Sequence, residues 1–208
     1  GKAGADRQPA MNTPDPCYGG VVWDEQVTKN MGLPFAYLLK LRTTLLRDLG
    51  GAMSPFNAWM FIQGLETLPL RMREHAKNAQ SVAEALAANK KVQSVTYPGL
   101  FEGAEKEKAD KYMTGGYGAL IGFELPGGKE AGSKFIDSLE LLYHVANIGD
   151  SRSLAIHPAT TTHSQLAPEE QLSAGVTPGY VRLSIGIENV EDIICLLYTS
   201  PSPRDPTK

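Results

Sequence analysis

Apolar residues follow a helical period up to about Asn89 and a mixture of helical and strand periods after it. The helical part predicts one helix over about 34–48, a second that opens at Ser54, and a third from Pro69 to Asn89. Ser54 is a typical N-cap, and the proline that follows it suits the first helical position. The second helix is apolar nearly all round, so we expect it to be buried. Its apolar residues are Phe56, Trp59, Met60, Ile62 and Leu65.

After Asn89, short strands and helices alternate. The strands are predicted at about 92–97, 118–125, 141–147 and 180–188. The helices are predicted at about 101–112, 129–139 and 168–172, with a last one from Val190. This order predicts an α/β or α+β fold, in which a small sheet packs on a layer of helices.

The strand predicted at 180–188 alternates strictly, with Val181, Leu183, Ile185 and Ile187 on one face and Arg182 on the other. Small residues follow Arg182 on its own face, so space is open in front of the guanidinium. Such an arginine can grip a small carboxylate through two parallel N–H···O bonds. The spacing alone favours a plainer alternative, an edge-strand arginine that is solvated or paired with Glu188.

Composition narrows the function classes. The chain has 208 residues, 42% of them hydrophobic, and a formal net charge of −3 without a basic stripe, which argues against nucleic acid as the main partner. No apolar run is long enough to span a membrane.

Cys17 and Cys195 have no metal or redox spacing, which favours a reducing cytoplasm. His157 and His163, six residues apart, fit no compact ligand pair, so we expect structural histidines and no metal.

Several short blocks follow one another in a specific order along the chain: Leu45–Gly50, Ser54–Trp59, Gln63–Leu68, Tyr97–Leu100, Phe135–Leu139, Asn147–Asp150, His157–His163 and Val181–Glu188. In their order and spacing they resemble the cystathionine synthase and lyase family of pyridoxal-phosphate (PLP) enzymes. The resemblance implies the C-terminal part of a fold-type-I PLP-dependent transferase, with long helices followed by a small sheet covered by helices. It divides the chain into the end of the PLP-binding large domain with its connecting helix (1–50), a C-terminal small domain (51–194) and an unrelated tail (195–208).

The resemblance also assigns a substrate site. In this family the arginine of the last block holds the α-carboxylate of the amino-acid substrate, which implies that role for Arg182. Asn147 and Ile148 would contribute to the same site. Asn147 and Gln63 resemble the sulfhydrylase branch, which replaces the acetate of O-acetylhomoserine with sulfide or methanethiol. The alternatives are a cystathionine γ-synthase, a methionine γ-lyase-like enzyme, or a non-catalytic dimerisation or anion-binding domain.

The resemblance places the cofactor apparatus elsewhere. The family's Schiff-base lysine precedes a landmark that matches Pro14-Asp15-Pro16, and no lysine here lies in the expected motif. We therefore expect no catalytic or cofactor-binding residue in this chain, and no activity from it alone. By itself the chain should expose the helical surface around Phe56 to Leu65, which the cofactor-binding domain would cover, and should tend to associate or aggregate. The complete enzyme is expected to bind PLP and to form a cytoplasmic homodimer or homotetramer. The tail from Cys195 to Lys208 carries three prolines among polar residues; we expect it to be artefactual and to add nothing to the fold.

Overall fold

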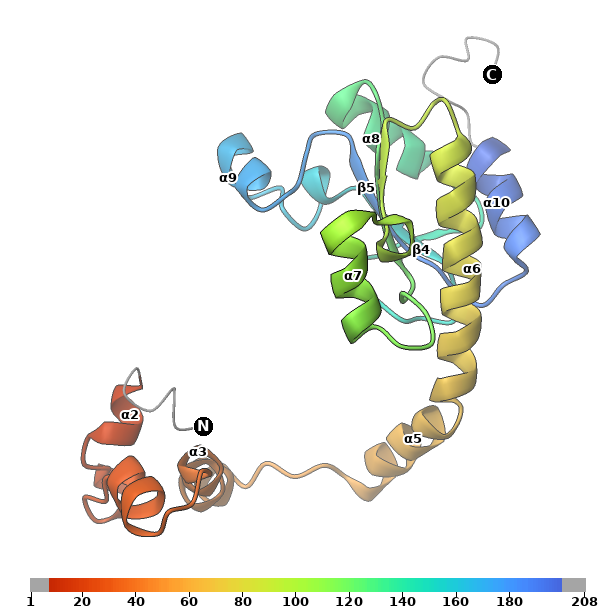
Figure 1. Cartoon of the computed structure of the whole chain (residues 1–208). Helices are drawn as coiled ribbons and strands as arrows, with labels where there is room; N and C mark the ends of the chain where they lie inside the picture. The colour runs from red at the N-terminus through yellow and green to blue at the C-terminus, as the bar shows by residue number, and fades with distance from the viewer. Residues whose placement is uncertain (1–7, 200–208) are drawn as a thin grey trace. The chain divides into compact units, whose positions relative to one another are not determined.

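The computed structural model of the chain describes residues 8–199, and its contacts divide the chain into two compact units, Gly1–Ile62 and Gln63–Lys208 (Figure 1). The expected end of a large-domain segment at residue 50 concerns a complete enzyme and stays a prediction. Within residues 8–199, no helix combines the length and apolar character that a membrane span needs.

The first unit is made of short helical segments. They are α2 (Pro9–Asn12), η1 (Pro16–Tyr18), the π-helix η2 (Asp24–Asn30), α3 (Ala36–Lys40), the π-helix η3 (Leu41–Leu46) and α4 (Arg47–Leu49). Their small core contains Met11, Trp23, Val27 and Ala36. The helix predicted over 34–48 is therefore confirmed in position, but its middle part, Leu41–Leu46, is a π-helix. Thr43 and Thr44 donate their hydroxyls to the carbonyls four residues back, a bond that often bends helices, and both lie in the π-helical stretch.

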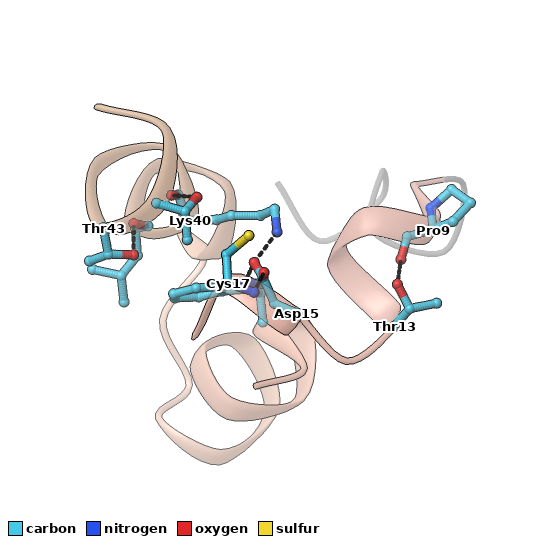
Figure 2. Close-up of polar contacts among 9 residues, drawn as sticks. Pro9, Thr13, Asp15, Cys17, Lys40 and Thr43 are labelled. Atoms are coloured by element: carbon cyan, nitrogen blue, oxygen red, sulfur yellow. Dashed lines mark hydrogen bonds and ion pairs between the residues drawn. The ribbon is translucent and has the colours of Figure 1, made fainter. Parts of the chain in front are cut away.

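A buried aspartate joins the segments of this unit (Figure 2). Asp15 accepts hydrogen bonds from Trp23 Nε1 at 2.7 Å and from Cys17 N at 3.0 Å, and it also pairs with Lys40 Nζ. The hydrogen bond from Lys40, followed by that from Trp23, lowers the pKa of the Asp15 carboxyl below its usual range. Asp15 thus links η1, η2 and α3 through one charged side chain.

Helix α5 (Pro55–Glu66) begins where the sequence predicts, and Ser54 Oγ accepts from Asn57 N at 3.1 Å. The burial that the apolar pattern predicts is not found among the described residues, because all of the large apolar residues of this helix are exposed; the exposure expected for this chain by itself is confirmed. The exposed fractions are 65% for Phe56, 54% for Trp59, 55% for Met60, 62% for Phe61, 52% for Ile62 and 61% for Leu65. An apolar pattern shows that a helix needs a covering surface, but it does not say which chain segment supplies one.

The second unit is a five-stranded sheet with helices. Its elements are α6 (Leu68–Ala88), β1 (Ser94–Thr96), η4 (Pro98–Leu100), α7 (Gly103–Tyr112), β2 (Leu120–Glu124), α8 (Gly128–Asp137), β3 (Tyr143–His144), β4 (Leu154–Ile156), η5 (Pro158–Thr160), α9 (Pro168–Ser173), β5 (Tyr180–Ser184) and α10 (Val190–Thr199). The strand order is β1-β2-β5-β4-β3, and all neighbours are antiparallel except the parallel pair of β3 and β4. The predicted mixed α/β fold is confirmed.

Two corrections concern the strands. β4 was not predicted: Leu154, Ala155 and Ile156 are all buried, so the strand shows no alternation and is too short for a period to be seen. β5 ends at Ser184 instead of Glu188, and Ile187, which was expected to point inward, is 38% exposed. β5 is also a central strand, which removes the alternative of an edge-strand arginine.

The main core lies between one face of the sheet and helices α6, α8 and α10. It includes Ala79, Val82, Ala83, Leu86, Ile121, Phe123, Phe135, Ile136, Val181, Leu183, Ile185, Ile193 and Leu197. Helices α6 and α10 lie side by side (Figure 1). The expectation that nothing from Cys195 onward joins the fold is wrong at Leu197, which is only 8% exposed because α10 continues to Thr199. Residues 200–208 lie outside the described part.

Candidate carboxylate-binding site

Arg182 lies in the middle of the sheet, on the face opposite the main core. It stands between Gly122 of β2 and Ile156 of β4 in the strand register. Its neighbours along β5, Val181 and Leu183, are completely buried, whereas Arg182 itself is half-buried. The alternation predicted for this strand is therefore confirmed around Arg182. Because hydrogen-bonded strands flank it on both sides, the backbone that carries the guanidinium is held on both edges.

The guanidinium of Arg182 is partly satisfied by backbone carbonyls. Nη2 donates to Ala146 O at 2.8 Å and lies 3.4 Å from Asn147 O. Nε is buried and has no hydrogen-bond partner among the described residues. Two carbonyls that accept from one nitrogen fix the plane of the guanidinium but do not neutralise its charge, so the group remains suited to a carboxylate.

Asn147 and Ile148 belong to the segment 147–153, which runs between β3 and β4. The backbone of Asn147 thus reaches Arg182, while the side chain of Ile148 is 62% exposed. Gly149 has a φ of 77°, a left-handed conformation that favours glycine, and its N–H donates to Ser184 Oγ at 3.3 Å. The structure brings Asn147 and Arg182 together across 35 residues of sequence. That these three residues bind substrate stays a prediction.

The alternative in which Arg182 pairs with Glu188 is wrong, because the Glu188 carboxylate binds other groups. The carboxylate accepts from Ser153 N at 2.6 Å and from Ser153 Oγ at 3.0 Å. Ser153 is completely buried. This contact cannot be predicted from the sequence, because neither the spacing nor any period relates Ser153 to Glu188.

Tyr180 borders the site on the same face of β5. A Cβ built on Gly122 would lie 2.0 Å from the Tyr180 hydroxyl, so the phenol covers the glycine opposite Arg182. Burial raises the pKa of Tyr180 above its usual range, and the charge of Arg182 opposes this shift. The neutral phenol is thus one wall of the space beside the guanidinium, and the absence of a side chain at Gly122 makes room for it.

The two histidines considered for metal binding have other partners. His157 is buried, its Nε2 lies 2.8 Å from Pro178 O and its Nδ1 lies 2.9 Å from Thr160 Oγ1. Burial lowers the pKa of His157 below its usual value. His163 Nδ1 lies 2.9 Å from Thr162 Oγ1. Both nitrogens of the His157 ring are engaged, which leaves none for a metal ion.

The described residues do not by themselves fit PLP. A lysine that holds this cofactor is usually desolvated so that its amine can react. Eight of the ten described lysines are exposed. The other two are paired: Lys40 with Asp15, and Lys106 with Asp110 and the Tyr117 hydroxyl. The arginine of the site suits the carboxylate of an amino acid, but no described lysine suits the cofactor.

The chain is similar to a known protein family and to proteins of known name. Residues 17–200 match the family model described as Cys/Met metabolism PLP-dependent enzyme. The chain is 54% identical over 185 residues to an O-acetyl-L-homoserine sulfhydrylase of Leptospira meyeri, covering 87% of this chain and 42% of that protein. It is 46% identical over 187 residues to O-acetyl-L-homoserine sulfhydrylase 1 of Thermus thermophilus, covering 90% of this chain and 43% of that protein. The chain therefore spans less than half the length of these relatives.

A solved structure is also similar. It is a putative O-acetylhomoserine (thiol)-lyase from Campylobacter jejuni, solved with an N'-pyridoxyl-lysine-5'-monophosphate. The two chains superpose with a TM-score of 0.78 at 41% identity, over 94% of this chain and 45% of that one. At this identity, the likeness extends beyond a shared fold to a shared ancestry.

Proposed function

This chain belongs to the PLP-dependent enzymes of cysteine and methionine metabolism, and from that premise we propose that it supplies the substrate-carboxylate-binding part of an O-acetylhomoserine sulfhydrylase. In the proposed reaction the Cγ–O bond of O-acetylhomoserine breaks and a Cγ–S bond to sulfide forms, which gives homocysteine and acetate. With methanethiol as the thiol, the product is methionine. The identity to two sulfhydrylases supports the choice of this branch.

The observation that carries the proposal is the position of Arg182. A guanidinium on a central strand, with one nitrogen fixed by the carbonyls of Ala146 and Asn147, is oriented before any substrate binds. Pre-orientation matters because a carboxylate held in one place also fixes the direction of the bonds at Cα, where the reaction begins. Asn147 and Ile148, on the segment next to the guanidinium, would complete the binding surface.

PLP, bound by a part of the enzyme outside the described residues, would supply the electron sink that makes the Cα proton removable. The described residues would bind and orient the amino acid and would not move a proton. We also propose a cytoplasmic homodimer or homotetramer for the complete enzyme. The exposed apolar face of α5 supports association, because a surface of this kind on a soluble protein usually meets another protein surface.

The test is substitution of Arg182 in a complete enzyme that carries these residues. Arg182→Ala should lower kcat/KM for O-acetylhomoserine in sulfide-dependent homocysteine formation by roughly ten- to a hundred-fold, which corresponds to the 1.5–3 kcal/mol of a hydrogen bond to a charged group. The matched control is Arg73→Ala, because Arg73 is an exposed arginine on α6. Unchanged kinetics in Arg182→Ala would refute the carboxylate assignment, and cystathionine formation in place of homocysteine would refute the sulfhydrylase assignment.

A further inference from the structure

The carboxylate of Glu188 ties two segments of the second unit together. Oε1 accepts from the N–H of Ser153 at 2.6 Å, and Oε2 accepts from its hydroxyl at 3.0 Å. The same hydroxyl oxygen accepts from Gly186 N at 2.9 Å. Glu188 itself is half-buried and Ser153 is completely buried, so water competes weakly for these bonds.

The close approach of the segments needs a glycine. A Cβ on Gly186 would lie 2.2 Å from Glu188 Oε2, 2.5 Å from Ser151 O and 2.6 Å from the carbonyl carbon of Arg152. Ile187 N adds a bond to Ser151 O at 2.9 Å. The chain that leaves β5 therefore lies directly against the end of the segment 147–153.

A second set of contacts holds Glu188 in place from the other side. Asn78 Nδ2, on α6, donates to the backbone carbonyl of Glu188 at 2.8 Å and lies 3.2 Å from Gly186 O. Asn78 is 1% exposed. The backbone that bears the carboxylate is thus fixed to the longest helix of the unit, and the carboxylate can transmit that rigidity to Ser153.

The other end of the tethered segment bears on Arg182. Ser153 closes the segment that begins at Asn147, and the carbonyl of Asn147 lies 3.4 Å from Arg182 Nη2. Between them, Gly149 N is held by Ser184 Oγ. We propose that Glu188 is a positioning residue: through Ser153 it holds the segment 147–153 against β5, and so fixes the carbonyls that orient Arg182. The effect of Glu188 on substrate binding rests on the proposed function, whereas its effect on the position of segment 147–153 does not.

The first test uses the 208-residue chain and amide hydrogen exchange, and it requires no activity. Glu188→Ala should speed exchange at Gly149 and Ile187 by roughly ten- to a hundred-fold, the factor for loss of a hydrogen bond to a charged group. Amides of the β2–β5 ladder should keep their rates. Glu188→Gln, which retains one acceptor and the same shape, should give a smaller increase at the same amides.

The matched control is Glu124, which makes the same kind of bridge elsewhere. Its carboxylate accepts from Gly179 N at 3.0 Å and from the Thr177 hydroxyl. Glu124→Ala should speed exchange at Gly179 and leave Gly149 and Ile187 unchanged. The proposal is overturned if Gly149 and Ile187 keep their rates in both Glu188 variants. It is equally overturned if the β2–β5 ladder speeds up by the same factor, which would mean that Glu188 contributes only to global stability.

The second test uses a complete enzyme and separates the two substrates. Glu188→Ala should raise KM for the amino-acid substrate by about tenfold, the factor for one net hydrogen bond, and leave KM for sulfide unchanged because sulfide has no carboxylate. If Arg182→Ala weakens amino-acid binding and Glu188→Ala does not, the positioning role is refuted and the proposed function stands. If neither variant affects amino-acid binding, the proposed function fails, while the exchange result still decides whether Glu188 holds the segment.

Discussion

The contact between Gly132 and His157 allows a substitution to be predicted in detail. A Cβ on Gly132, in the middle of α8, would lie 2.5 Å from both Cδ2 and Nε2 of the His157 ring. The ring cannot easily move away, because Nε2 is held at 2.8 Å from Pro178 O and Nδ1 at 2.9 Å from Thr160 Oγ1. Gly132→Ala must therefore displace either the ring or the helix.

The change in the free energy of unfolding combines two destabilising effects and one stabilising effect. Overpacking of a buried site costs about 1–3 kcal/mol. Loss of the hydrogen bond between His157 and Pro178 costs about 1 kcal/mol more. Alanine is about 1 kcal/mol better than glycine inside a helix, which offsets part of this loss. The net expectation for Gly132→Ala is a decrease of about 1–3 kcal/mol in the free energy of unfolding.

Urea denaturation would measure this change as a lower midpoint at an unchanged slope. Gly64→Ala is the control, because Gly64, near the end of helix α5, belongs to the same unit as Gly132 and has nothing within 4 Å of the added Cβ. That variant should lose no stability. A Gly132→Ala protein as stable as the parent would refute the reasoning.

A double-mutant cycle tests the cause as well as the size. In a His157→Ala background the ring is gone, so Gly132→Ala should cost nothing and could gain up to about 1 kcal/mol from helix propensity. If Gly132→Ala costs as much in that background as in the parent, the loss does not come from the His157 ring.

Three further outcomes follow from buried or paired groups. Leu197→Ala should lower the free energy of unfolding by about 2–5 kcal/mol, measured by urea denaturation, because Leu197 lies in the core; an unchanged value would show that the end of α10 is not docked. Because the pKa of His157 is lowered in the folded chain, the unfolded chain binds a proton more readily, so the free energy of unfolding should fall as pH drops below about 6.5, by at most about 1.4 kcal/mol per pH unit. His157→Asn should reduce this pH dependence. His144→Gln is the control and should leave the pH dependence unchanged, because His144 is exposed. Mixing the chain with PLP and borohydride should label scattered surface lysines without turnover of O-acetylhomoserine; stoichiometric labelling of one lysine with turnover would contradict the assignment of the cofactor site to other residues.

An element with one buried face and one exposed face is well suited to prediction from its sequence. In helix α6 the apolar period predicts one stripe of five residues, Met72, Ala76, Ala79, Ala83 and Leu86; the last four are buried, whereas Met72 is 40% exposed. β4 was missed for the opposite reason: it is buried on both faces and has only three residues. Periodicity reports a difference between two faces, so it cannot detect an element that has none.

In the candidate site, too, only some features could be predicted from local sequence. Alternation in β5 placed Arg182 on the face away from the core, and this needed only local sequence. The contact of Arg182 with the carbonyls of Ala146 and Asn147 could not be derived, because backbone carbonyls carry no residue-specific signal. Only the resemblance to a family associated Asn147 with Arg182. The bond from Ser153 to Glu188 has no local signal either, since it depends on how β4 and β5 are paired.

The central position of β5 has a thermodynamic consequence. Because Arg182 lies on a strand bonded on both edges, its backbone position cannot be lost by fraying of an edge; it is lost only when the sheet itself opens. Any carboxylate that binds at Arg182 must therefore stabilise the whole second unit, by RT ln(1 + [L]/Kd) for a ligand at concentration [L]. A rise in Tm with ligand concentration would then measure affinity directly, without a catalytic assay. Conversely, a substitution that weakens the sheet anywhere would weaken apparent binding once the unfolded fraction becomes significant, even if it never touches the ligand.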